Sequence, residues 1–280
     1  MLQLTSDDCP RTNGMPMLGL GTWQNKEREP CVEAVLTALD EGYRHIDTAQ
    51  VYGNERHVGE GLSRSDVPRD EVFVATKLWK NNLTYDESIT QDDAYIGAKR
   101  SAELLGVDTI DLLYVHWPAE DYGDGTLEAL DKLYDEGIIN AAGVSNFTPE
   151  LLREAEDKLD APLIANQVET HPLLPQDEML SVTDELGIDL VAYSPLARGK
   201  VFDIPEIQEV AEKHGVSEAQ VSLAWLLERG VKPIPKSADP EHIRDNYGAL
   251  DLELDDEDVE KIDSIDQRER LIDPEFAPDW

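Results

Sequence analysis

Four polar side chains of the sequence have the types that a proton-transfer site needs. Asp47 and Tyr52 lie in the segment HIDTAQVYGNE, Lys77 lies in ATKLW, and His116 lies in YVHWP. The pKa of a tyrosine is ordinarily about 10, and a nearby ammonium such as Lys77 is expected to lower it. Asp47 would hold that ammonium in an ion pair, so that Tyr52 acts as a general acid toward an oxygen that gains negative charge. His116 would hydrogen-bond the same oxygen and orient the substrate.

Apolar walls for such a site are available in the same parts of the chain. Three tryptophans are expected to line a concave substrate pocket: Trp23, Trp79 and Trp117. Taken singly, Lys77 could be a solvated charge, His116 a core histidine and Tyr52 a loop cap. The polar candidates fall, however, at the ends of three successive predicted strands, and this favours a shared site.

The elements that must position these residues alternate regularly. Short apolar, β-branched runs predict eight strands, at residues 17–20, 43–46, 72–76, 110–115, 139–144, 163–168, 188–193 and 231–235. Segments of helical periodicity lie between them, with prolines near their starts and glycines just past their ends. The prolines are Pro30, Pro149 and Pro240, and the glycines are Gly42, Gly106, Gly137, Gly187 and Gly230. Eight strand–helix units predict an α/β fold, a (β/α)8 TIM barrel, whose active site forms at the C-terminal ends of the strands.

A doubly wound dinucleotide-binding fold is disfavoured, because the run from Gly19 to Gln24 lacks the third glycine of GxGxxG. No composition break marks a linker, so residues 1–280 are expected to form a single domain. Within it, residues 1–16, with Cys9, are expected to form a hairpin that closes the bottom of the barrel. Residues 250–280 are expected to form a C-terminal helix and tail, with the amphipathic stretch Val259–Ile262–Ile265 packed against the barrel.

Composition excludes several classes of function. The chain carries 24 Lys+Arg against 60 Asp+Glu, a net charge of −36, which disfavours binding to nucleic acid or to anionic membranes. It shows no transmembrane run, no secretory leader and only two cysteines, so a cytoplasmic location is expected. The absence of HExxH and of a Cys/His cluster predicts no metal site, and the absence of GxSxG disfavours serine hydrolysis. The acidity also predicts a halophilic surface, adapted to molar salt that shortens the Debye length to about 3 Å.

Eight short motifs in order resemble the aldo-keto reductase superfamily over roughly residues 14–250. They are GLGTW at 19–23, HIDTAQVYGNE at 45–55, TKLW at 76–79, HWP at 116–118, GVSNF at 143–147, NQVE at 166–169, AYSPLARG at 192–199 and IPKS at 234–237. The subgroup that the chain resembles most is that of small prokaryotic reductases similar to 2,5-diketo-D-gluconate reductase. The resemblance implies a barrel that binds NADP(H) and transfers hydride to the carbonyl of aldehydes or ketones. It also implies that Tyr52 is the acid, that Lys77 and Asp47 tune it, and that His116 positions the carbonyl.

The same resemblance implies which residues bind the cofactor. Gly21, Thr22 and Trp23 belong to this set, Tyr193 would stack on the nicotinamide, and its carboxamide would meet Ser145, Asn146 and Gln167. The pyrophosphate would lie along Ser194, Leu196 and Arg198, the adenosine 2′-phosphate at Lys236 and Ser237, and the adenine near Asp245 and Asn246.

One position departs from the family pattern. Many members carry an arginine six residues after the lysine that matches Lys236, and here that position is His242. A neutral imidazole is a poorer phosphate partner than a guanidinium. NADPH is therefore the expected cofactor, with a weakened preference that leaves NADH possible.

Two other functions remain compatible with the sequence. The catalytic residues serve both directions, so the protein could be an oxidative alcohol or sugar dehydrogenase. It could also be a cofactor-sensing subunit without activity, because fold alone does not fix function. The loops at 119–126 and 199–204 and the C-terminal tail at 270–280 are expected to set the substrate range. They are short, which suggests an open pocket for small aldehydes, ketones, keto sugars or dicarbonyls, with Trp280 either over the pocket or away from it. The protein is expected to be a monomer and to bind a small carbonyl compound as its substrate.

Overall fold

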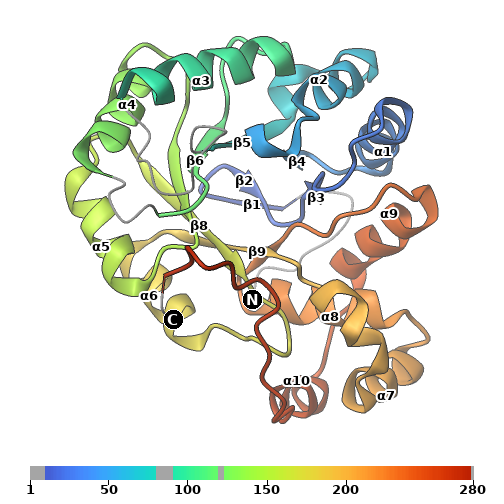
Figure 1. Cartoon of the computed structure of the whole chain (residues 1–280). Helices are drawn as coiled ribbons and strands as arrows, with labels where there is room; N and C mark the ends of the chain where they lie inside the picture. Colours follow the sequence, from blue (N-terminus) through green and yellow to red (C-terminus); the bar gives the residue numbers. More distant parts are fainter. Residues whose placement is uncertain (1–9, 80–90, 119–122, 279–280) are drawn as a thin grey trace.

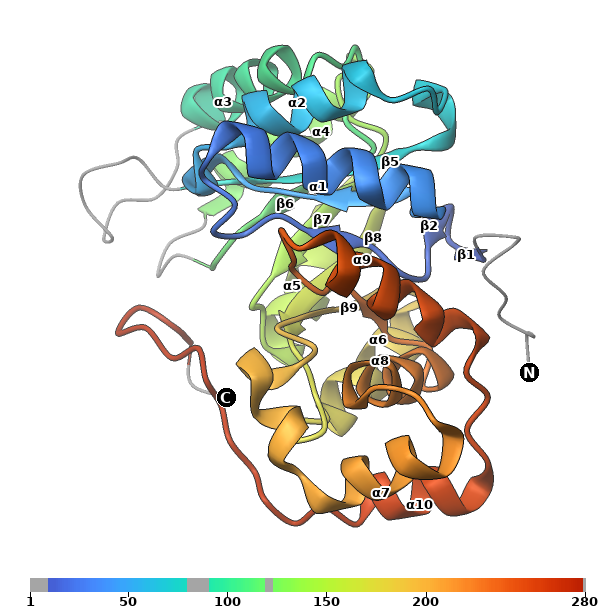
Figure 2. The same cartoon turned by 90° about the vertical axis from the view of Figure 1, so that its right-hand side faces the viewer.

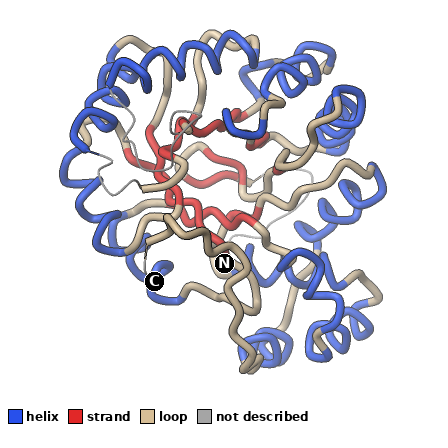
Figure 3. The backbone as a smooth tube through the Cα atoms, viewed as in Figure 1, coloured by secondary structure: helices blue, strands red, loops and turns tan. Residues whose placement is uncertain are grey.

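In a computed structural model of the chain, the described residues are 10–79, 91–118 and 123–278. Eight parallel strands form one sheet whose order along the sheet is the order in the chain. They are β3 (Leu20–Gly21), β4 (His45–Asp47), β5 (Phe73–Leu78), β6 (Leu112–Val115), β7 (Ala142–Ser145), β8 (Leu163–Glu169), β9 (Asp189–Tyr193) and β10 (Lys232–Pro233). Each overlaps the run predicted for it. Figure 3 shows these strands at the centre of a ring of helices.

The sheet closes on itself between its first and last strands. Gly21 pairs in parallel with Lys236, and the Gly21 N–H donates to the carbonyl of Pro235 at 3.0 Å. A Cβ atom at position 21 would lie 2.7 Å from the carbonyl oxygen of Ile234, so only glycine permits this approach. The closure confirms the predicted (β/α)8 barrel.

Helices follow the strands and cover the outside of the sheet (Figure 1). They are α1 (Arg28–Glu41), α2 (Glu55–Arg64), α3 (Gln91–Leu105), α4 (Gly123–Asp135), α5 (Pro149–Lys158), α6 (Asp177–Leu186), α7 (Pro205–His214), α8 (Glu218–Glu228), α9 (Pro240–Tyr247) and α10 (Asp256–Asp263). The five glycines predicted to end helices all have positive φ, and Pro149 and Pro240 begin α5 and α9 as expected. None of the helices in the described ranges is long and apolar enough to cross a membrane.

Apolar side chains pack in two places. The larger cluster lies between the sheet and the helices and contains residues such as Val35, Leu113 and Leu226. A smaller one is built around the strands and includes Leu112 and Val191. Since both faces of the sheet are covered, the strands read as continuous apolar runs rather than as alternating ones.

The two ends of the barrel are covered by segments from opposite ends of the chain. The predicted N-terminal hairpin is present as β1 (Arg11–Thr12) paired with β2 (Met15–Pro16), while Cys9 lies outside the described residues. The predicted C-terminal helix is α10, and the chain after it returns to the far end of the barrel (Figure 2). Trp280 lies outside the described residues.

Candidate active site

The structure brings the four predicted polar side chains together at the C-terminal end of the barrel. Asp47 is the last residue of β4, Lys77 lies near the end of β5, and His116 directly follows β6. Tyr52 ends the short 3-10 helix η2 (Gln50–Tyr52) that follows β4. Because parallel strands end at the same edge of a sheet, residues spread over 70 positions of the sequence become neighbours.

Lys77 and Asp47 form a buried ion pair behind the site. The Lys77 ammonium donates to one oxygen of Asp47 and to the Thr48 carbonyl, the latter at 2.9 Å. The other Asp47 oxygen accepts from Nε2 of Gln167 at 2.9 Å. Burial raises the pKa of Asp47 and lowers the pKa of Lys77, and their mutual attraction opposes both shifts. The pair is therefore held in place from three strands.

Tyr52 lies close to this pair, with its ring centroid 5.2 Å from the Lys77 ammonium. The expected lowering of its pKa is wrong for this arrangement. Burial raises the pKa of Tyr52 well above its ordinary value, and the negative charge of Asp47 adds to the effect. The Lys77 ammonium, which is paired with Asp47, does not reverse this shift, because burial outweighs it. Tyr52 therefore remains a protonated phenol, a proton donor, throughout the neutral pH range.

His116 faces Tyr52, with 5.8 Å between the ring centroids. Burial, together with the charge of Lys77, holds the pKa of His116 well below its ordinary value, so the imidazole is neutral. Its Nδ1 atom has no hydrogen-bond partner among the described residues. A neutral imidazole can donate one N–H to a substrate oxygen without adding charge to the site.

A cleft of about 670 Å³ opens above these groups. Most of the predicted site residues line it: Gly21, Thr22, Trp23, Asp47, Tyr52, Trp79, His116, Trp117, Asn146, Gln167, Tyr193, Ser194, Leu196, Arg198 and Lys236. The predicted residues Lys77, Ser145, Ser237, His242, Asp245 and Asn246 are not among the residues that line it. The three tryptophans thus lie on the cleft as expected.

The middle of the cleft is ordered by a chain of hydrogen bonds between strand ends. The Tyr193 hydroxyl donates to Oδ1 of Asn146 at 2.8 Å, and Nδ2 of Asn146 donates to the His116 carbonyl at 3.0 Å. The Ser145 hydroxyl donates to the Gln167 carbonyl at 2.8 Å. Asn146 has a φ of 64°, a left-handed conformation that asparagine tolerates better than most residues. Tyr193 is therefore held with its ring on the cleft.

Two cationic side chains line the cleft. The Arg198 guanidinium lies 5.0 Å from the ring centroid of Trp23, and Lys236 is exposed. Neither forms an ion pair with a carboxylate within the described part of the chain. In a chain with a net charge of −36, two unpaired cations on one apolar cleft fit an elongated anion with a flat ring, as a nicotinamide dinucleotide is.

The residues predicted around the adenosine end divide into two groups. Ser237 and Asp245 already have partners. The Ser237 hydroxyl accepts from the Asp239 N–H, and the Asp245 carboxylate accepts from Ser217, the N-cap of the neighbouring helix α8, and from Gln220 of that helix. The others lie on α9, with His242 exposed, Asn246 buried, and Arg244 3.5 Å from Glu41. The cofactor roles of these residues stay predictions.

The C-terminal segment, which was expected to help shape the pocket, forms one wall of the site. Ile272 lines the cleft, and the ring of Phe276 packs edge-on against Trp79 and Trp117, with centroids 6.4 and 5.4 Å apart. Short loops suggested an open pocket, and this segment, together with Gly199 and Phe202 of the 199–204 loop, walls the cleft.

Within the described ranges, no group of three His, Cys, Asp or Glu side chains is arranged to hold a metal ion.

Comparison with known proteins agrees with the barrel. Residues 17–267 match the model of the aldo/keto reductase family, and the chain belongs to that family. It is 41% identical over 261 residues to glyoxal reductase of Bacillus subtilis, covering 92% of this chain and 91% of that protein. It is 38% identical over 271 residues to the methylglyoxal reductase DkgB of Escherichia coli O157:H7, covering 95% and 99%.

Solved structures show the same likeness. One protein described as a 2,5-diketo-D-gluconic acid reductase B superposes with a TM-score of 0.89 at 33% identity, over 100% of this chain and 98% of that one. An aldo-keto reductase of Bombyx mori in complex with NADP superposes with a TM-score of 0.84 at 31% identity, over 97% and 94%. The resemblance seen in the eight motifs is confirmed.

Proposed function

We propose that the protein is an NADP(H)-dependent reductase that transfers hydride to the carbonyl of small aldehydes, ketones, keto sugars or dicarbonyls. The observation that carries the proposal is the placement of a protonated Tyr52 and a neutral His116 side by side on the cleft, in front of the buried Lys77–Asp47 pair. The reductases of small dicarbonyls among the relatives support this substrate class.

Each of the site residues then has a distinct role in the reaction. A bound nicotinamide cofactor supplies the hydride for the carbonyl carbon. Tyr52 donates its hydroxyl proton to the carbonyl oxygen, which gains negative charge as the reaction proceeds. His116 donates a hydrogen bond to the same oxygen and fixes its direction. Lys77 stabilises the tyrosinate left behind, because its ammonium lies 5.2 Å from the Tyr52 ring, and Asp47 holds the ammonium there.

Cofactor choice follows from the cations near the cleft. Arg198 and Lys236 supply positive charge for the phosphates, and the ring of Tyr193 supplies a flat surface for the nicotinamide. Lys236 favours NADPH, whereas the occupied Ser237 hydroxyl and the imidazole at His242 offer less to a 2′-phosphate than an arginine would. A relative from Saccharomyces cerevisiae, glycerol 2-dehydrogenase (NADP(+)), is 38% identical and supports NADP use. It also supports, as a second candidate, the oxidative direction on the same residues.

The experiment that tests the proposal replaces one hydroxyl. Tyr52→Phe keeps the ring and removes the proton donor, and we expect kcat for methylglyoxal reduction in molar KCl to fall by about 10²- to 10⁴-fold. NADPH binding, followed by quenching of tryptophan fluorescence, should stay close to that of the wild type. The matched control is Tyr134→Phe on the outer face of α4, which should leave kcat unchanged.

Retained turnover in Tyr52→Phe would contradict the acid assignment. The same assay run with NADPH and with NADH measures cofactor preference. A higher kcat/KM with NADPH supports the role given to Lys236, and an equal or higher value with NADH would contradict it. No turnover with either cofactor, by folded protein that binds NADPH, would favour the cofactor-sensing reading.

A further inference from the structure

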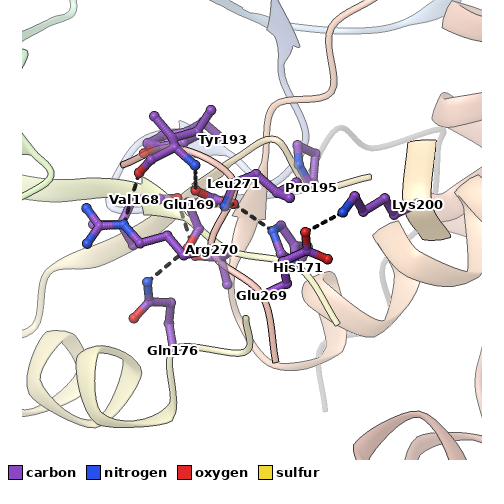
Figure 4. A network of polar contacts seen from close by, with 12 residues as sticks. Val168, Glu169, His171, Gln176, Tyr193, Pro195, Lys200, Glu269, Arg270 and Leu271 are labelled. Atoms are coloured by element: carbon purple, nitrogen blue, oxygen red, sulfur yellow. Dashed lines mark hydrogen bonds and ion pairs between the residues drawn. The ribbon is translucent and has the colours of Figure 1, made fainter. Parts of the chain in front are cut away.

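A buried carboxylate lies just outside the catalytic group. Glu169 is the last residue of β8 and only 2% exposed. One of its oxygens accepts from the Leu271 N–H and the other from the Ile272 N–H, both at 2.8 Å, and Nε2 of the buried His171 lies 2.9 Å from the carboxylate (Figure 4). Glu169 thus joins the end of a barrel strand to a segment about 100 residues later in the chain.

Other contacts tie the same segment down on either side. The Glu269 N–H donates to the Leu173 carbonyl at 2.9 Å, and the Glu269 carboxylate pairs with Lys200 (Figure 4). Lys200 belongs to the 3-10 segment η4 (Ala197–Asp203), which also carries Arg198 on the cleft. Residues 269–276 therefore form a strap, fixed at its start by β8 and by η4.

The remainder of the strap reaches the substrate end of the cleft. Ile272 lines the cleft directly, and Phe276 packs against Trp79 and Trp117. Trp79 in turn lies 5.0 Å from the His116 ring, centroid to centroid. The position of the strap therefore decides how much room is left beside the group that receives the carbonyl.

The carboxylate of Glu169 matches the geometry of the donors around it. Burying a carboxylate is costly unless its oxygens are filled with donors, and here three donors fill them. Two backbone N–H groups, one on each oxygen, require an acceptor at both positions, which a carboxylate provides and an amide does not. Glu169 also lies two positions after Gln167 on the same strand, so β8 supports both Asp47 and the strap.

We propose that Glu169 is a specificity-determining positioning residue: by holding the N–H groups of Leu271 and Ile272, it fixes the strap as a wall of the substrate pocket and so restricts the pocket to small carbonyl compounds. The inference rests on the proposed function, because it assigns the size selection to that same site. Glu169 touches neither Tyr52 nor His116, so its effect is on fit and not on proton transfer.

The test is Glu169→Gln, which preserves size and places an N–H₂ against a backbone N–H. Hydrogen exchange of the Leu271 and Ile272 amides should become faster by about 10-fold or more, since one hydrogen bond is lost and a repulsive contact replaces it. With NADPH, the ratio of kcat/KM for 2-naphthaldehyde to that for methylglyoxal should rise by about 10-fold, a change of the size that pocket contacts control. The kcat for methylglyoxal should stay within about 3-fold of the wild type, because KM carries the change.

Three further variants keep the result interpretable. Glu178→Gln makes the same change of charge at an exposed position on α6 and should alter neither amide exchange nor selectivity. Lys200→Met removes the other tie and should have a smaller effect, because its ion pair with Glu269 is half exposed. Phe276→Ala leaves the anchor intact and should shift selectivity in the same direction, which keeps the inference testable if Glu169→Gln does not fold.

The outcomes separate the two proposals. Unchanged amide exchange in folded Glu169→Gln, or equal losses of kcat/KM for both aldehydes together with a lower kcat, would overturn the inference and leave Glu169 a structural residue. Wild-type protein that reduces neither aldehyde would instead overturn the proposed function, while the exchange of the two amides would still report whether Glu169 holds the strap.

Discussion

The barrel contains two buried lysine–aspartate pairs, one at each end, and they have different surroundings. At the C-terminal end, Lys77 pairs with Asp47, and at the N-terminal end Lys232, the first residue of β10, pairs with Asp189, the first residue of β9. Both lysines are fully buried. Residue type, partner and burial are therefore nearly the same in the two pairs.

The neighbours of the pairs are not the same. Lys77 and Asp47 stand behind Tyr52 on an open cleft. Lys232 is covered by the hairpin: its ammonium donates to the Thr12 hydroxyl, which donates to Asp189 at 3.1 Å. A buried ion pair is thus no sign of catalysis by itself. Such a pair indicates catalysis only where a titratable group and a cavity lie beside it. The pair at the bottom of the barrel contributes to stability instead, as residues at that end commonly do.

The largest expected effect comes from removing each lysine in turn. In Lys77→Met, kcat for carbonyl reduction should fall by about 10²-fold or more, because the tyrosinate formed by proton donation loses its counter-charge. In Lys232→Met, kcat should stay near that of the wild type at a temperature where the variant is folded. Its free energy of unfolding should instead fall by about 3–5 kcal/mol, since Asp189 is left buried without its partner. Urea unfolding and initial rates in molar KCl measure both quantities.

The matched double variants serve as the control. Lys232→Met with Asp189→Leu should recover much of the lost stability, because two apolar side chains leave no buried charge. Lys77→Met with Asp47→Leu should recover stability in the same way and yet stay inactive. Activity in this second double variant would show that the two pairs differ only in position and not in role.

A further effect is expected from acid at the N-terminal end of the barrel. His45 begins β4, is fully buried, and stacks edge-on against Phe73. Burial, with the charges of Lys77, Lys232 and Arg11 adding to it, lowers the pKa of His45 to about 3. The folded state therefore keeps His45 neutral, whereas the unfolded chain binds a proton below about pH 6.5.

The sign of the effect follows from this difference. Stability due to the low pKa is complete above about pH 6.5 and is lost as the pH falls from there toward 3, by up to about 4–5 kcal/mol. His45→Leu removes the titrating group, so its free energy of unfolding should decline less than that of the wild type between pH 7 and pH 4. His242→Gln, an exposed histidine on α9, should follow the wild-type curve. Parallel curves for wild type and His45→Leu would contradict the assignment.

Much of this arrangement could be predicted from the sequence, because the order of the strands determines it. Once eight strands are recognised, the residues that follow them must meet at one end, and this places Asp47, Tyr52, Lys77 and His116 together. The bounds were less certain: the strand predicted at 17–20 is Leu20–Gly21, because Met17 and Leu18 pack in the core before the strand begins.

What could not be predicted depends on burial and on contacts distant in sequence. Lys232 stands in VKPIP, where a lysine reads as solvated, and only the closed barrel shows that Asp189 and the hairpin enclose it. The pKa of Tyr52 was predicted in the wrong direction, because burial outweighs a neighbouring charge that already has a partner. The strap at 269–276 is held by Glu169 from far away in the chain, and its own residues carry no periodic pattern.

The smallest expected effect is that of salt on stability. It distinguishes the charged surface, which salt should screen, from the buried Lys232–Asp189 pair. With 60 acidic against 24 basic residues, exposed carboxylates repel one another in dilute buffer, and molar KCl screens that repulsion. The Tm of the wild type should therefore rise from dilute buffer to molar KCl, and a Tm that does not rise would contradict a halophilic surface. The Lys232–Asp189 pair is covered by the hairpin, so salt should leave the stability difference between wild type and Lys232→Met constant within about 0.5 kcal/mol. If that difference shrinks as salt is added, solvent ions screen the Lys232–Asp189 pair, which would contradict the enclosure that distinguishes it from the Lys77–Asp47 pair.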